Sequence, residues 1–594
     1  MSEEERKAYT NEKIAPEAQA AEISRFERKI EKLEQQKLDP DDFKRFRLEN
    51  GVYGIRGTMD EHMVRIKCRY GVLTADQLES MADVAEEFAT PKVAHITTRQ
   101  AIQMHKIKRG NVTKVLNRLT ESGLTTREAC GNTVRNVSAC HFSGISAEEL
   151  FDVNPYADAV SRYFLRHPIC QNLPRKFKIA FEGCPTDHAR CPIHDIGAVA
   201  KMGQVDGKEV RGFQIYVGGG LGSVPFGAYL LEEFTPANLV IPTIEAVIRL
   251  FDRNGDRKNK NTARLKYVIK NWGIEKFREE LETERKVVLM TSPGRNQWEI
   301  EVYETEAPPL VKEIPTTLPV ADANFKHWSK TNVIRQKQAG YVTIQVRCPM
   351  GDIGIKEMRG VARIARTYSG GRLRTAITQN LVIPWVPEKA AQAVYQELVG
   401  LGIAYTDAES LADMTRCPGA DTCNLAITHS RGLADSLMSL FDDKEGQALL
   451  EDKSLKNLSI KISGCTNSCG HHHIADLGFH GAATRINGHT VPTYMVMVGG
   501  RTAEGIAEFG QRLGMVPAKR LKEAIKKLLE LYRDQCQGEE IFRDWVNRVG
   551  PDQLKKEMEA FKDLPSFEEA PEMYEDLGSI GEFKVEVGKG ECAA

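Results

Sequence analysis

The chain has 594 residues, 41% of them hydrophobic and 27% charged, which is the composition of a folded globular protein long enough for several domains. Its 81 basic and 82 acidic residues leave a net charge of −1, and this balance excludes a general electrostatic attraction to nucleic acid or to an anionic membrane. Any anion that the protein binds must therefore be held by a local group of basic residues.

The first residues and the cysteines indicate a reducing compartment. Residues 1–7 are charged and contain no apolar signal region, and no run of about 18 apolar residues follows them. The 13 cysteines are an odd number spread thinly over the chain, which suits reduced thiols and a metal centre better than a set of disulfides. We expect a cytoplasmic protein with no membrane partner and no nucleic-acid partner.

Helix and strand patterns alternate from the start of the chain. Residues 15–50 are charged, with apolar residues at helical spacing, and predict a helix that packs on the body or serves in assembly. After Gly51, residues 64–68 indicate a strand, 74–89 an amphipathic helix and 95–108 another strand. This order predicts an α+β fold.

Five basic residues of the first part stand at the ends of predicted strands. They are Arg65, Arg99, Arg135, Lys176 and Lys178. Strand alternation in Lys176-Phe177-Lys178 places both lysines on one face and Phe177 on the other. Single basic residues are usually solvated at the surface, but two ammonium groups that point inward require an anion. The pattern predicts an anion site.

The same patterns return in the second part of the chain, so the sequence contains an internal repeat. The matching segments are 64–67 with 342–345, 96–102 with 376–382, 177–184 with 458–465, and 217–220 with 498–501. One duplicated ancestor explains them most economically. On this alignment Cys130 lies opposite Cys417, and Cys184 lies opposite Cys465. The second half alone keeps four cysteines, and the first half carries positive charge instead.

The cysteines of the second half form two close pairs. Cys417 and Cys423 make a C-x5-C motif, and 41 residues later Cys465 and Cys469 make a C-x3-C motif. Small and turn-forming residues flank each pair, so the backbone can curl around a compact object. Four thiolates arranged in this way can hold an iron–sulfur cluster.

These motifs, together with the segment 172–178 (Asn-Leu-Pro-Arg-Lys-Phe-Lys), give residues 45–550 a resemblance to the siroheme-dependent nitrite and sulfite reductases. The resemblance implies an internally duplicated α+β fold, with two ferredoxin-like halves and two siroheme/[4Fe-4S]-binding α+β domains related by pseudo-twofold symmetry. It implies that a [4Fe-4S] cluster is held by Cys417, Cys423, Cys465 and Cys469. Cys469 would also bridge to the siroheme iron.

The resemblance also distributes the basic residues between cofactor and substrate. It assigns Arg99 mainly to the siroheme carboxylates. Those placed on the substrate side are Arg65, Arg135, Lys176 and Lys178. There they would bind the oxyanion, stabilise its charge as oxygen leaves as water, and relay protons. Arginine offers a planar fork to the oxyanion, and lysine offers a mobile proton donor.

The expected domains follow the repeat. They are a helical extension at 1–55, ferredoxin-like half 1 at 56–125, a siroheme and substrate domain at 126–320, ferredoxin-like half 2 at 321–405, a [4Fe-4S]/siroheme domain at 406–560 and a tail at 561–594. Nearly every segment belongs to the repeat, and no flavin or pyridine-nucleotide domain is visible. Electrons must therefore come from another protein: ferredoxin by the resemblance, with a flavoprotein as the alternative. We expect a monomer.

The predicted reaction is the six-electron reduction of sulfite to sulfide, with nitrite to ammonia as the alternative. Nitrite reductases of the family commonly carry asparagine where this chain has Lys178, whereas the sulfite reductases carry lysine at both positions of the pair. An iron–sulfur scaffold or sensor without siroheme is a further alternative, but the retained basic residues argue against it. Dissimilatory sulfite reduction is disfavoured because no second cluster motif is present.

Several features stay open at this stage. Tyr53 and Cys130 match positions where some bacterial members carry a tyrosine and a cysteine beside the haem, sometimes covalently joined. The pattern C-x3-H-x2-C-x2-H from Cys184 to His194 could be drawn as a zinc site, but the repeat favours a relic cluster loop. The three histidines that follow Gly470 favour a loop packed on the cluster over another metal site, and residues 217–222 favour backbone approach to the macrocycle. No role is assigned to Cys592.

Overall fold

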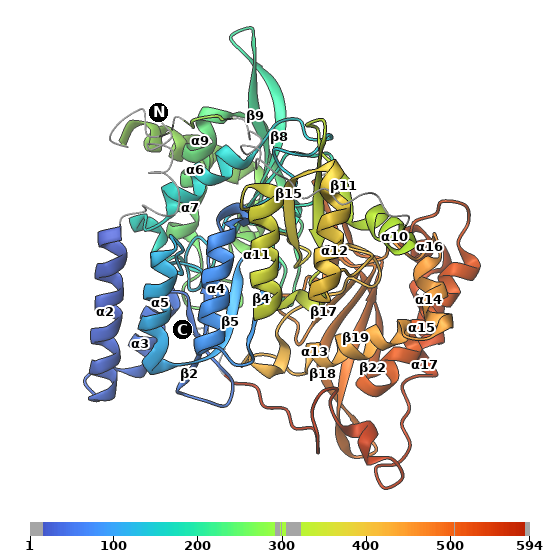
Figure 1. The fold of residues 1–594 in the computed structure, drawn as a ribbon. Helices are drawn as coiled ribbons and strands as arrows, with labels where there is room; N and C mark the ends of the chain where they lie inside the picture. The colour runs from blue at the N-terminus through green and yellow to red at the C-terminus, as the bar shows by residue number, and fades with distance from the viewer. Residues whose placement is uncertain (1–15, 292–297, 299, 304–321, 504, 589–594) are drawn as a thin grey trace.

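The computed structural model describes residues 16–291, 298, 300–303, 322–503 and 505–588 (Figure 1). The tail cysteine Cys592 lies outside the described residues. None of the described helices is both long enough and apolar enough to cross a membrane.

Two helices precede the first sheet and pack against it, as the apolar spacing of residues 15–50 predicts. They are α2 (Pro16–Glu34) and α3 (Pro40–Glu49). The carboxylate of Asp39 caps α3 by accepting hydrogen bonds from the amides of Asp41 and Asp42. Phe26 of α2 is buried and contacts the rings of Phe43 and Phe46, with ring centroids 5.9 and 5.3 Å apart. The extension is thus part of the hydrophobic core.

Two smaller sheets with helices on one face follow the repeat. The first half contributes β1 (Val52–Gly54), β2 (Glu61–Ile66), β3 (Val72–Thr74), α4 (Ala75–Phe88), β4 (Val93–Ile96), β5 (Ile102–Lys108) and α5 (Val112–Glu121). The second half contributes α10 (Ala323–Asn332), β11 (Val333–Arg335), β12 (Tyr341–Val346), β13 (Asp352–Gly354), α11 (Ile355–Ser369), β14 (Arg372–Thr375), β15 (Leu381–Pro387) and α12 (Ala391–Leu401).

Each of these sheets borrows one strand from the other half. The orders are β1-β2-β5-β4-β13 and β11-β12-β15-β14-β3, so β13 closes the first sheet and β3 closes the second. Helices α4 and α11 stand side by side across the joint (Figure 1), where Arg359 pairs with Asp83 at 2.8 Å and Arg366 with Asp76 at 2.6 Å. One hydrophobic core therefore serves both halves.

The predicted strand at 95–108 is two strands. β4 ends at Ile96 and β5 starts at Ile102. Between them Gln100 has a φ of 58°, in the left-handed region, and its side chain donates to the carbonyls of Ala139 (3.0 Å) and Thr375 (2.9 Å). The apolar pattern alone does not show this tight loop, because a tertiary contact holds it.

Two larger mixed sheets complete the molecule. The first contains β6 (Ser138–Ala139), β7 (Ile179–Glu182), β8 (Ile196–Val205), β9 (Lys208–Val217) and β10 (Tyr229–Pro236), with helices α6 (Asn154–Phe164), α7 (Val240–Asn254), α8 (Leu265–Trp272) and α9 (Ile274–Thr291). The second contains β16 (Thr415–Arg416), β17 (Ile460–Ser463), β18 (Leu477–Ile486), β19 (His489–Val498) and β22 (Gln511–Pro517), with helices α13 (Ser430–Met438), α14 (Lys444–Glu451), α15 (Leu521–Gln535), α16 (Phe542–Val549) and α17 (Pro551–Glu559). A short hairpin, β20 (Arg501–Ala503) and β21 (Ile506–Glu508), lies beside it.

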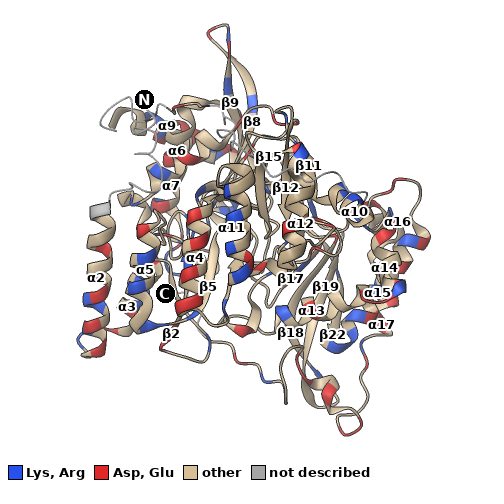
Figure 2. Cartoon of the chain, in the orientation of Figure 1, with Lys and Arg blue, Asp and Glu red and all other residues tan. Residues whose placement is uncertain are grey.

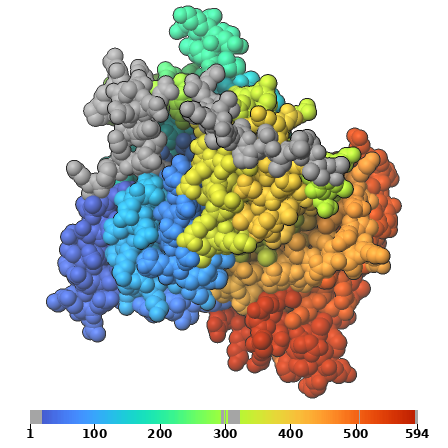
Figure 3. Space-filling model, in the orientation of Figure 1, coloured from blue at the N-terminus to red at the C-terminus, as the bar shows by residue number. Residues whose placement is uncertain are grey.

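The two larger sheets have the same connectivity, which confirms the duplicated α+β fold. Their orders are β10-β9-β8-β7-β6 and β16-β17-β18-β19-β22. In both, three strands run parallel (β6-β7-β8 and β16-β17-β18) and a hairpin extends the sheet in antiparallel fashion. The β8–β9 hairpin projects from the body at the top of the molecule (Figures 1 and 3).

Strand registers identify equivalent residues and correct the sequence alignment at one cysteine. Ser138 pairs with Ala180, and Thr415 pairs with Lys461. The next cysteines therefore correspond: the amide of Cys140 donates to Phe181 at 3.0 Å, and that of Cys417 donates to Ile462 at 3.1 Å. The prediction that Cys130 lies opposite Cys417 was wrong. The connections that lead from α5 to β6 and from α12 to β16 differ in length, and no sequence landmark marks that difference.

The alignment of the smaller sheets also shifts. Ile66 pairs with the first residue of β5 and Val346 pairs with the first residue of β15, so Arg65 corresponds to Gln345 rather than to a residue two positions earlier. Gln100 corresponds to Gln379, whose φ of 71° and side-chain bond to the carbonyl of Ile96 (2.7 Å) mirror it. The five basic residues consequently do not occupy the positions of the second half's cysteines.

Candidate active site

Two loops at one edge of the second larger sheet carry the four cysteines. Cys417 and Cys423 follow β16, and Cys465 and Cys469 follow β17. Because β16 and β17 are parallel neighbours, their carboxyl ends meet at the same edge. The amide of Gly464 donates to the sulfur of Cys417 at 3.2 Å, which joins the two loops directly.

Glycines allow the backbone to wrap tightly around these loops. Gly419, between the first two cysteines, has a φ of +66°, and a Cβ there would lie 2.4 Å from the hydroxyl of Ser430. A Cβ on Gly470, directly after Cys469, would lie 2.0 Å from the carbonyl oxygen of Ile462. A side chain at either position would push the cysteine loops apart.

The four thiols are close enough to influence one another, yet they are not a single-ion site. Burial raises the pKa of Cys465, and the charges of Cys469, Cys417 and Cys423 raise it further. Burial also raises the pKa of Cys423 to about 11. Among the described residues, the group of ligand atoms gathered within 4.8 Å of one another lies elsewhere, around Cys140. Thiols that are coupled but more widely separated fit a cluster of several irons better than one tetrahedral ion.

Cys469 differs from its partners because its side chain is exposed, whereas Cys417 is buried. The hydroxyl of Thr98, in the loop between β4 and β5, donates to the carbonyl of Cys469 at 3.0 Å. This contact brings the first ferredoxin-like sheet against the second cysteine pair. Cys469 therefore lies where the two halves meet.

Arg99 follows Thr98 in that loop, and part of its buried guanidinium has no hydrogen-bond partner among the described residues. One nitrogen of its guanidinium donates to the carbonyls of Asn136 (2.6 Å) and Ile179 (3.3 Å), while Nε and Nη1 are buried with no hydrogen-bond partner among the described residues. Burial lowers the pKa of Arg99 to about 9, and the charge of Arg135 adds to this effect. A polycarboxylate such as siroheme fits this cation.

Arg65 and Arg135 meet at the ring of Tyr53. The hydroxyl of Tyr53 accepts from Arg65 at 3.3 Å and from Arg135 at 3.5 Å, and both arginines donate to the carbonyl of Ala129. Arg135 also donates twice to the carbonyl of Gly131, at 3.0 and 2.7 Å. Cys130, between these two carbonyls, is buried in the same cluster as Tyr53. The covalent link between Tyr53 and Cys130 stays a prediction.

Lys178 connects the basic group to the cysteines. Burial lowers the pKa of Lys178 well below its usual value, and the positive charges of Arg99, Lys176 and Arg264 lower it further. The thiol of Cys469 acts in the opposite direction, so ammonium and thiol lie within electrostatic reach. Lys176, two residues earlier, is half-buried. The predicted basic residues thus gather around the side of Cys469 that faces the first half.

The sequence analysis missed a second layer of basic residues. Arg264 is buried and donates three hydrogen bonds to the carboxylate of Asp195, at 3.3, 3.0 and 2.8 Å. The same carboxylate accepts from the amide of Lys178 at 2.9 Å. Lys266 donates to the carbonyls of Gly220 (3.3 Å) and Leu221 (3.2 Å). The spacing of two between Arg264 and Lys266 matches that of Lys176 and Lys178 and could have indicated them.

The histidines after Cys469 hold the glycine loop in place. His471, His472 and His473 are all buried. His473 lies 2.8 Å, through Nε2, from the carbonyl of Gly222, which links the cysteine loop to the segment 217–222. This agrees with a packing role for the three histidines.

The duplicated fold places an equivalent cleft on the other side of the pseudo-twofold axis, and its chemistry is different. Its cavity of about 190 Å³ is lined by acidic and basic residues together, which include Glu409, Asp413, Asp476, Arg190, Lys461 and Arg501. At the positions of the five basic residues this side carries Gln345, Thr378, Ala412, Asn457 and Ser459. Only one of the two clefts therefore presents the five basic side chains.

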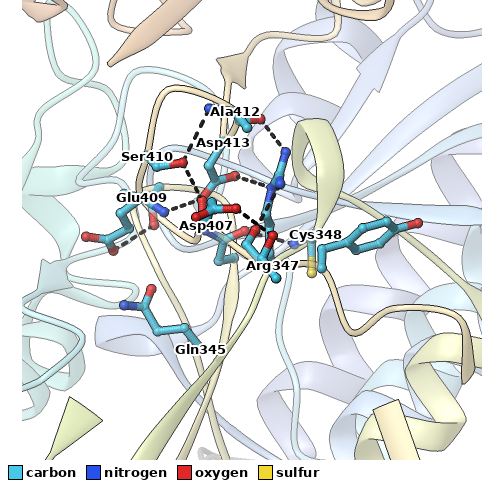
Figure 4. A network of polar contacts seen from close by, with 12 residues as sticks. Gln345, Arg347, Cys348, Asp407, Glu409, Ser410, Ala412 and Asp413 are labelled. Atoms are coloured by element: carbon cyan, nitrogen blue, oxygen red, sulfur yellow. Dashed lines mark hydrogen bonds and ion pairs between the residues drawn. The ribbon is translucent and has the colours of Figure 1, made fainter. Parts of the chain in front are cut away.

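Figure 4 shows how the acidic side is occupied by its own polar contacts. The guanidinium of Arg347 lies 3.6 Å from the carboxylate of Asp413, which also accepts from Asn380 (2.5 Å) and from the amide of Glu409 (2.8 Å). Asp413 stands at the position of Asn136, whose neighbour in the first cleft is Arg99. An anionic macrocycle would meet the carboxylates of Glu409, Asp413 and Asp476 here, although Arg190, Lys461 and Arg501 also line the cavity.

Comparisons with known proteins agree with this geometry. The model of the nitrite and sulphite reductase 4Fe-4S domain matches residues 130–289 and 408–563, and that of the nitrite/sulfite reductase ferredoxin-like half domain matches residues 56–122 and 334–401. The chain is 30% identical to a sulfite reductase [ferredoxin] of Mycobacterium tuberculosis, over 83% of each chain. It is 27% identical to an assimilatory ferredoxin-dependent nitrite reductase of Haloferax mediterranei, over 88% of each chain.

A solved structure shows the same fold. The Mycobacterium tuberculosis NirA protein superposes with a TM-score of 0.73 at 28% identity, covering 87% of this chain and 92% of that one.

Proposed function

The chain belongs to the nitrite and sulfite reductase family, and on that premise we propose that it reduces sulfite to sulfide with six electrons taken from ferredoxin. Relatives that resemble it about equally are named for sulfite and for nitrite, so the reduction of nitrite to ammonia is the second candidate. A flavoprotein is the alternative donor. We also propose that the protein acts as a monomer.

The family implies siroheme and a [4Fe-4S] cluster, which together supply electrons singly to a bound anion. We assign the cluster to Cys417, Cys423, Cys465 and Cys469, because the parallel ends of β16 and β17 bring their loops together. In this assignment Cys469 would hold the cluster on the side that faces siroheme, since it is the exposed member of the four. The two orphaned nitrogens of Arg99 are assigned to siroheme carboxylates.

The remaining basic residues are assigned to the substrate. Arg65 and Arg135, held side by side by Tyr53 and the carbonyl of Ala129, offer guanidinium donors to the oxygens of the anion. Lys176 and Lys178 offer ammonium groups, and the lowered pKa of Lys178 suits a group that gives up a proton as oxygen leaves as water. Arg135 is buried and the other three are half-buried, and partial removal from water strengthens their attraction to the anion.

The observation that carries the choice of sulfite is Lys178 itself. Its ammonium lies near Arg99, Lys176 and Arg264, and although Asp195 pairs with Arg264, the remaining positive charge favours a strongly anionic ligand. Sulfite, with a charge up to −2, meets this need better than nitrite with −1.

Steady-state kinetics with both anions on the holoprotein test the proposal. We expect a larger kcat/KM for sulfite than for nitrite in the wild type. In Lys178→Asn the ratio should shift toward nitrite by about tenfold or more, because about 1.4 kcal/mol of differential binding is a factor of ten.

The control for this experiment is Lys201→Asn on β8. Lys201 is an exposed lysine paired with Glu233 at 3.1 Å, far along the strand from the cleft, and its replacement should leave the ratio unchanged. A wild-type preference for nitrite would reject sulfite as the substrate and favour the second candidate.

A further inference from the structure

The first half retains a counterpart of the cluster-binding loops that no part of the proposed reaction uses. Cys140 follows β6 as Cys417 follows β16, with equivalent hydrogen bonds to the neighbouring strand. The segment after β7 carries Cys184 at the position of Cys465 and His188 at the position of Cys469. Three of the four ligand positions thus still carry residues that bind metals.

These side chains converge on one point. The sulfur atoms of Cys140 and Cys184 are 3.9 Å apart, and the sulfur of Cys140 is 3.4 Å from Nδ1 of His188. Glu182, at the end of β7, adds a carboxylate oxygen, and the four ligand atoms all lie within 4.8 Å of one another. From geometry alone, tetrahedral zinc with bonds of about 2.3 Å to sulfur and about 2.0 Å to nitrogen separates two sulfurs by about 3.8 Å, and sulfur from nitrogen by about 3.5 Å.

We propose that Cys140, Cys184, His188 and Glu182 bind one zinc ion, a closed structural site that stands in the first half where the second half holds its cluster. The proposal is independent of the substrate of the enzyme. The ion would fasten the end of β6 to the loop after β7.

The proposed ligands are largely buried, and their positions are fixed by surrounding residues. Cys140, Cys184 and Glu182 are 1%, 3% and 1% exposed, and Phe142, Ile145 and Trp385 belong to the same hydrophobic cluster as the two cysteines. The carboxylate of Glu182 accepts from the amides of Gly183 and Cys184 (both 2.9 Å) and of Ala189 (2.7 Å). These bonds fix the carboxylate and shape the loop that presents His188, as outer contacts commonly do around metal ligands.

A nearby cation balances the negative charge that the ligands would carry with a metal bound. Arg374, buried nearby and bound to the carbonyls of His141 (2.9 Å) and Ser143 (2.6 Å), offsets the excess negative charge of two thiolates and a carboxylate.

The donor set differs from the one that the local sequence pattern suggests. The sulfur of Cys191 lies against backbone carbonyls, 3.7 Å from that of Ala180, and Nδ1 of His194 is 2.7 Å from the carbonyl of Arg190. Neither residue belongs to the group around Cys140. In the proposed site Cys140, which is 44 positions before Cys184 in the chain, and Glu182 take their places.

Elemental analysis of the full-length holoprotein, purified from zinc-supplemented cells and dialysed against a chelator, tests the site. We expect one zinc per chain in addition to the cofactor iron. X-ray absorption at the zinc edge should show two sulfur neighbours at about 2.3 Å and two nitrogen or oxygen neighbours at about 2.0 Å. Cys140→Ser and His188→Gln should each lose the zinc and lower Tm, while the siroheme absorption remains.

Cys191→Ser is the matched control, since it removes a buried cysteine of the same loop that lies outside the donor set. It should keep the zinc. A wild type without zinc, zinc retained in both ligand variants, or a disulfide between Cys140 and Cys184 in the native protein would each overturn the proposal. If Cys140→Ser does not fold, the zinc content of His188→Gln and the X-ray absorption spectrum of the wild type still test whether the site binds zinc.

Discussion

Arg99 is the clearest example of a residue whose side chain is positioned to bind a ligand. Two of its nitrogens are buried without a partner among the described residues, and burial together with Arg135 lowers its pKa to about 9. A buried, unsatisfied polar group destabilises a protein by about 1–3 kcal/mol, and by more when it is charged. Such a residue is tolerated where a ligand later satisfies it.

Replacing Arg99 by glutamine should therefore have opposite effects on two states of the protein. In the cofactor-free protein we expect stability that is unchanged or higher, because an uncompensated buried charge is removed. In the holoprotein we expect lower siroheme occupancy. Thermal unfolding of both forms, together with the siroheme absorption, measures the two effects.

Arg211→Gln serves as the control, because Arg211 lies over the ring of Phe151 at 5.3 Å on β9 and takes no part in the cleft. Equal siroheme occupancy in Arg99→Gln and the wild type would contradict the assignment of Arg99 to the cofactor.

The candidate site could be predicted from sequence only where its residues form local patterns. The cysteine pairs and the Lys176-Phe177-Lys178 segment are such patterns, and the structure gathers them. Arg264 and Asp195 are 69 positions apart, and their ion pair exists only because the fold brings the start of α8 to the start of β8. Cys140 was not recognised as the partner of Cys184, since their proximity depends on the register of β6 against β7.

At the scale of elements, hydrogen bonds hold the C-terminal segment, residues 576–588, against the loops that carry the cysteines. The carboxylate of Asp576, which is 1% exposed, accepts from the amide of His429 (2.8 Å) and lies 2.9 Å from its Nδ1. The amide of Gly588 donates to the carbonyl of Asn424, next to Cys423. Figure 3 shows the end of the chain along the lower face of the molecule.

The contact between His429 and Asp576 should weaken as the pH rises. The hydrogen bond to Asp576 raises the pKa of His429 above its usual 6.5. The stability from the charged imidazole is therefore fully present below pH 6.5 and is lost as the pH rises through the higher pKa of the folded state. Hydrogen exchange in residues 576–588 should be faster at pH 8.5 than at pH 6, after correction for the intrinsic rate.

His429→Gln should remove most of this pH dependence. Exchange of α17, which lies outside the contact, serves as the internal reference. Equal protection of residues 576–588 at both pH values in the wild type would contradict the role of His429.

The exchange of β3 and β13 between the smaller sheets makes the two halves depend on each other. Leu73 of β3 is 1% exposed and pairs with Leu373 of β14, in the other half. We expect Leu73→Ala to lower the free energy of unfolding by about 2–5 kcal/mol, as for other buried leucines. Urea unfolding followed by tryptophan fluorescence measures the change.

Met59→Ala is the control, because Met59 is 83% exposed and should contribute little. Loss of the first sheet's structure alone, with the second half still folded, would contradict the view that the two halves share one core.

At the scale of the whole molecule, duplication followed by divergence explains the single active site. The two larger sheets are equivalent, but the first side carries the five basic residues, whereas the cavity of the second side mixes Glu409, Asp413 and Asp476 with Arg190, Lys461 and Arg501. Figure 2 shows basic and acidic residues interspersed along the elements, in keeping with the net charge of −1. The proposed binding of an anion therefore rests on the local group of basic residues, because the surface as a whole carries no excess of positive charge.

The architecture followed from the repeat, because duplicated strand and helix patterns predict duplicated sheets. The exchange of β3 and β13 between the two smaller sheets could not be predicted from the repeat. Both strands are three residues long and carry no periodic pattern. The domain limits drawn from the sequence, such as 56–125 for the first ferredoxin-like half, remain a proposal. Strand exchange across the pseudo-twofold axis means that no limit separates the two halves completely.

The central claim is that the basic cleft beside Cys469 holds siroheme coupled to a [4Fe-4S] cluster. The absorption spectrum of the purified protein, recorded before and after sulfite is added to the reduced form, tests it most directly. We predict a chlorin band together with iron–sulfur absorption, and a shift of the chlorin band on addition of sulfite that is absent in Cys469→Ser. Iron–sulfur absorption with no chlorin band would contradict the claim and leave an iron–sulfur protein without a site for the reaction.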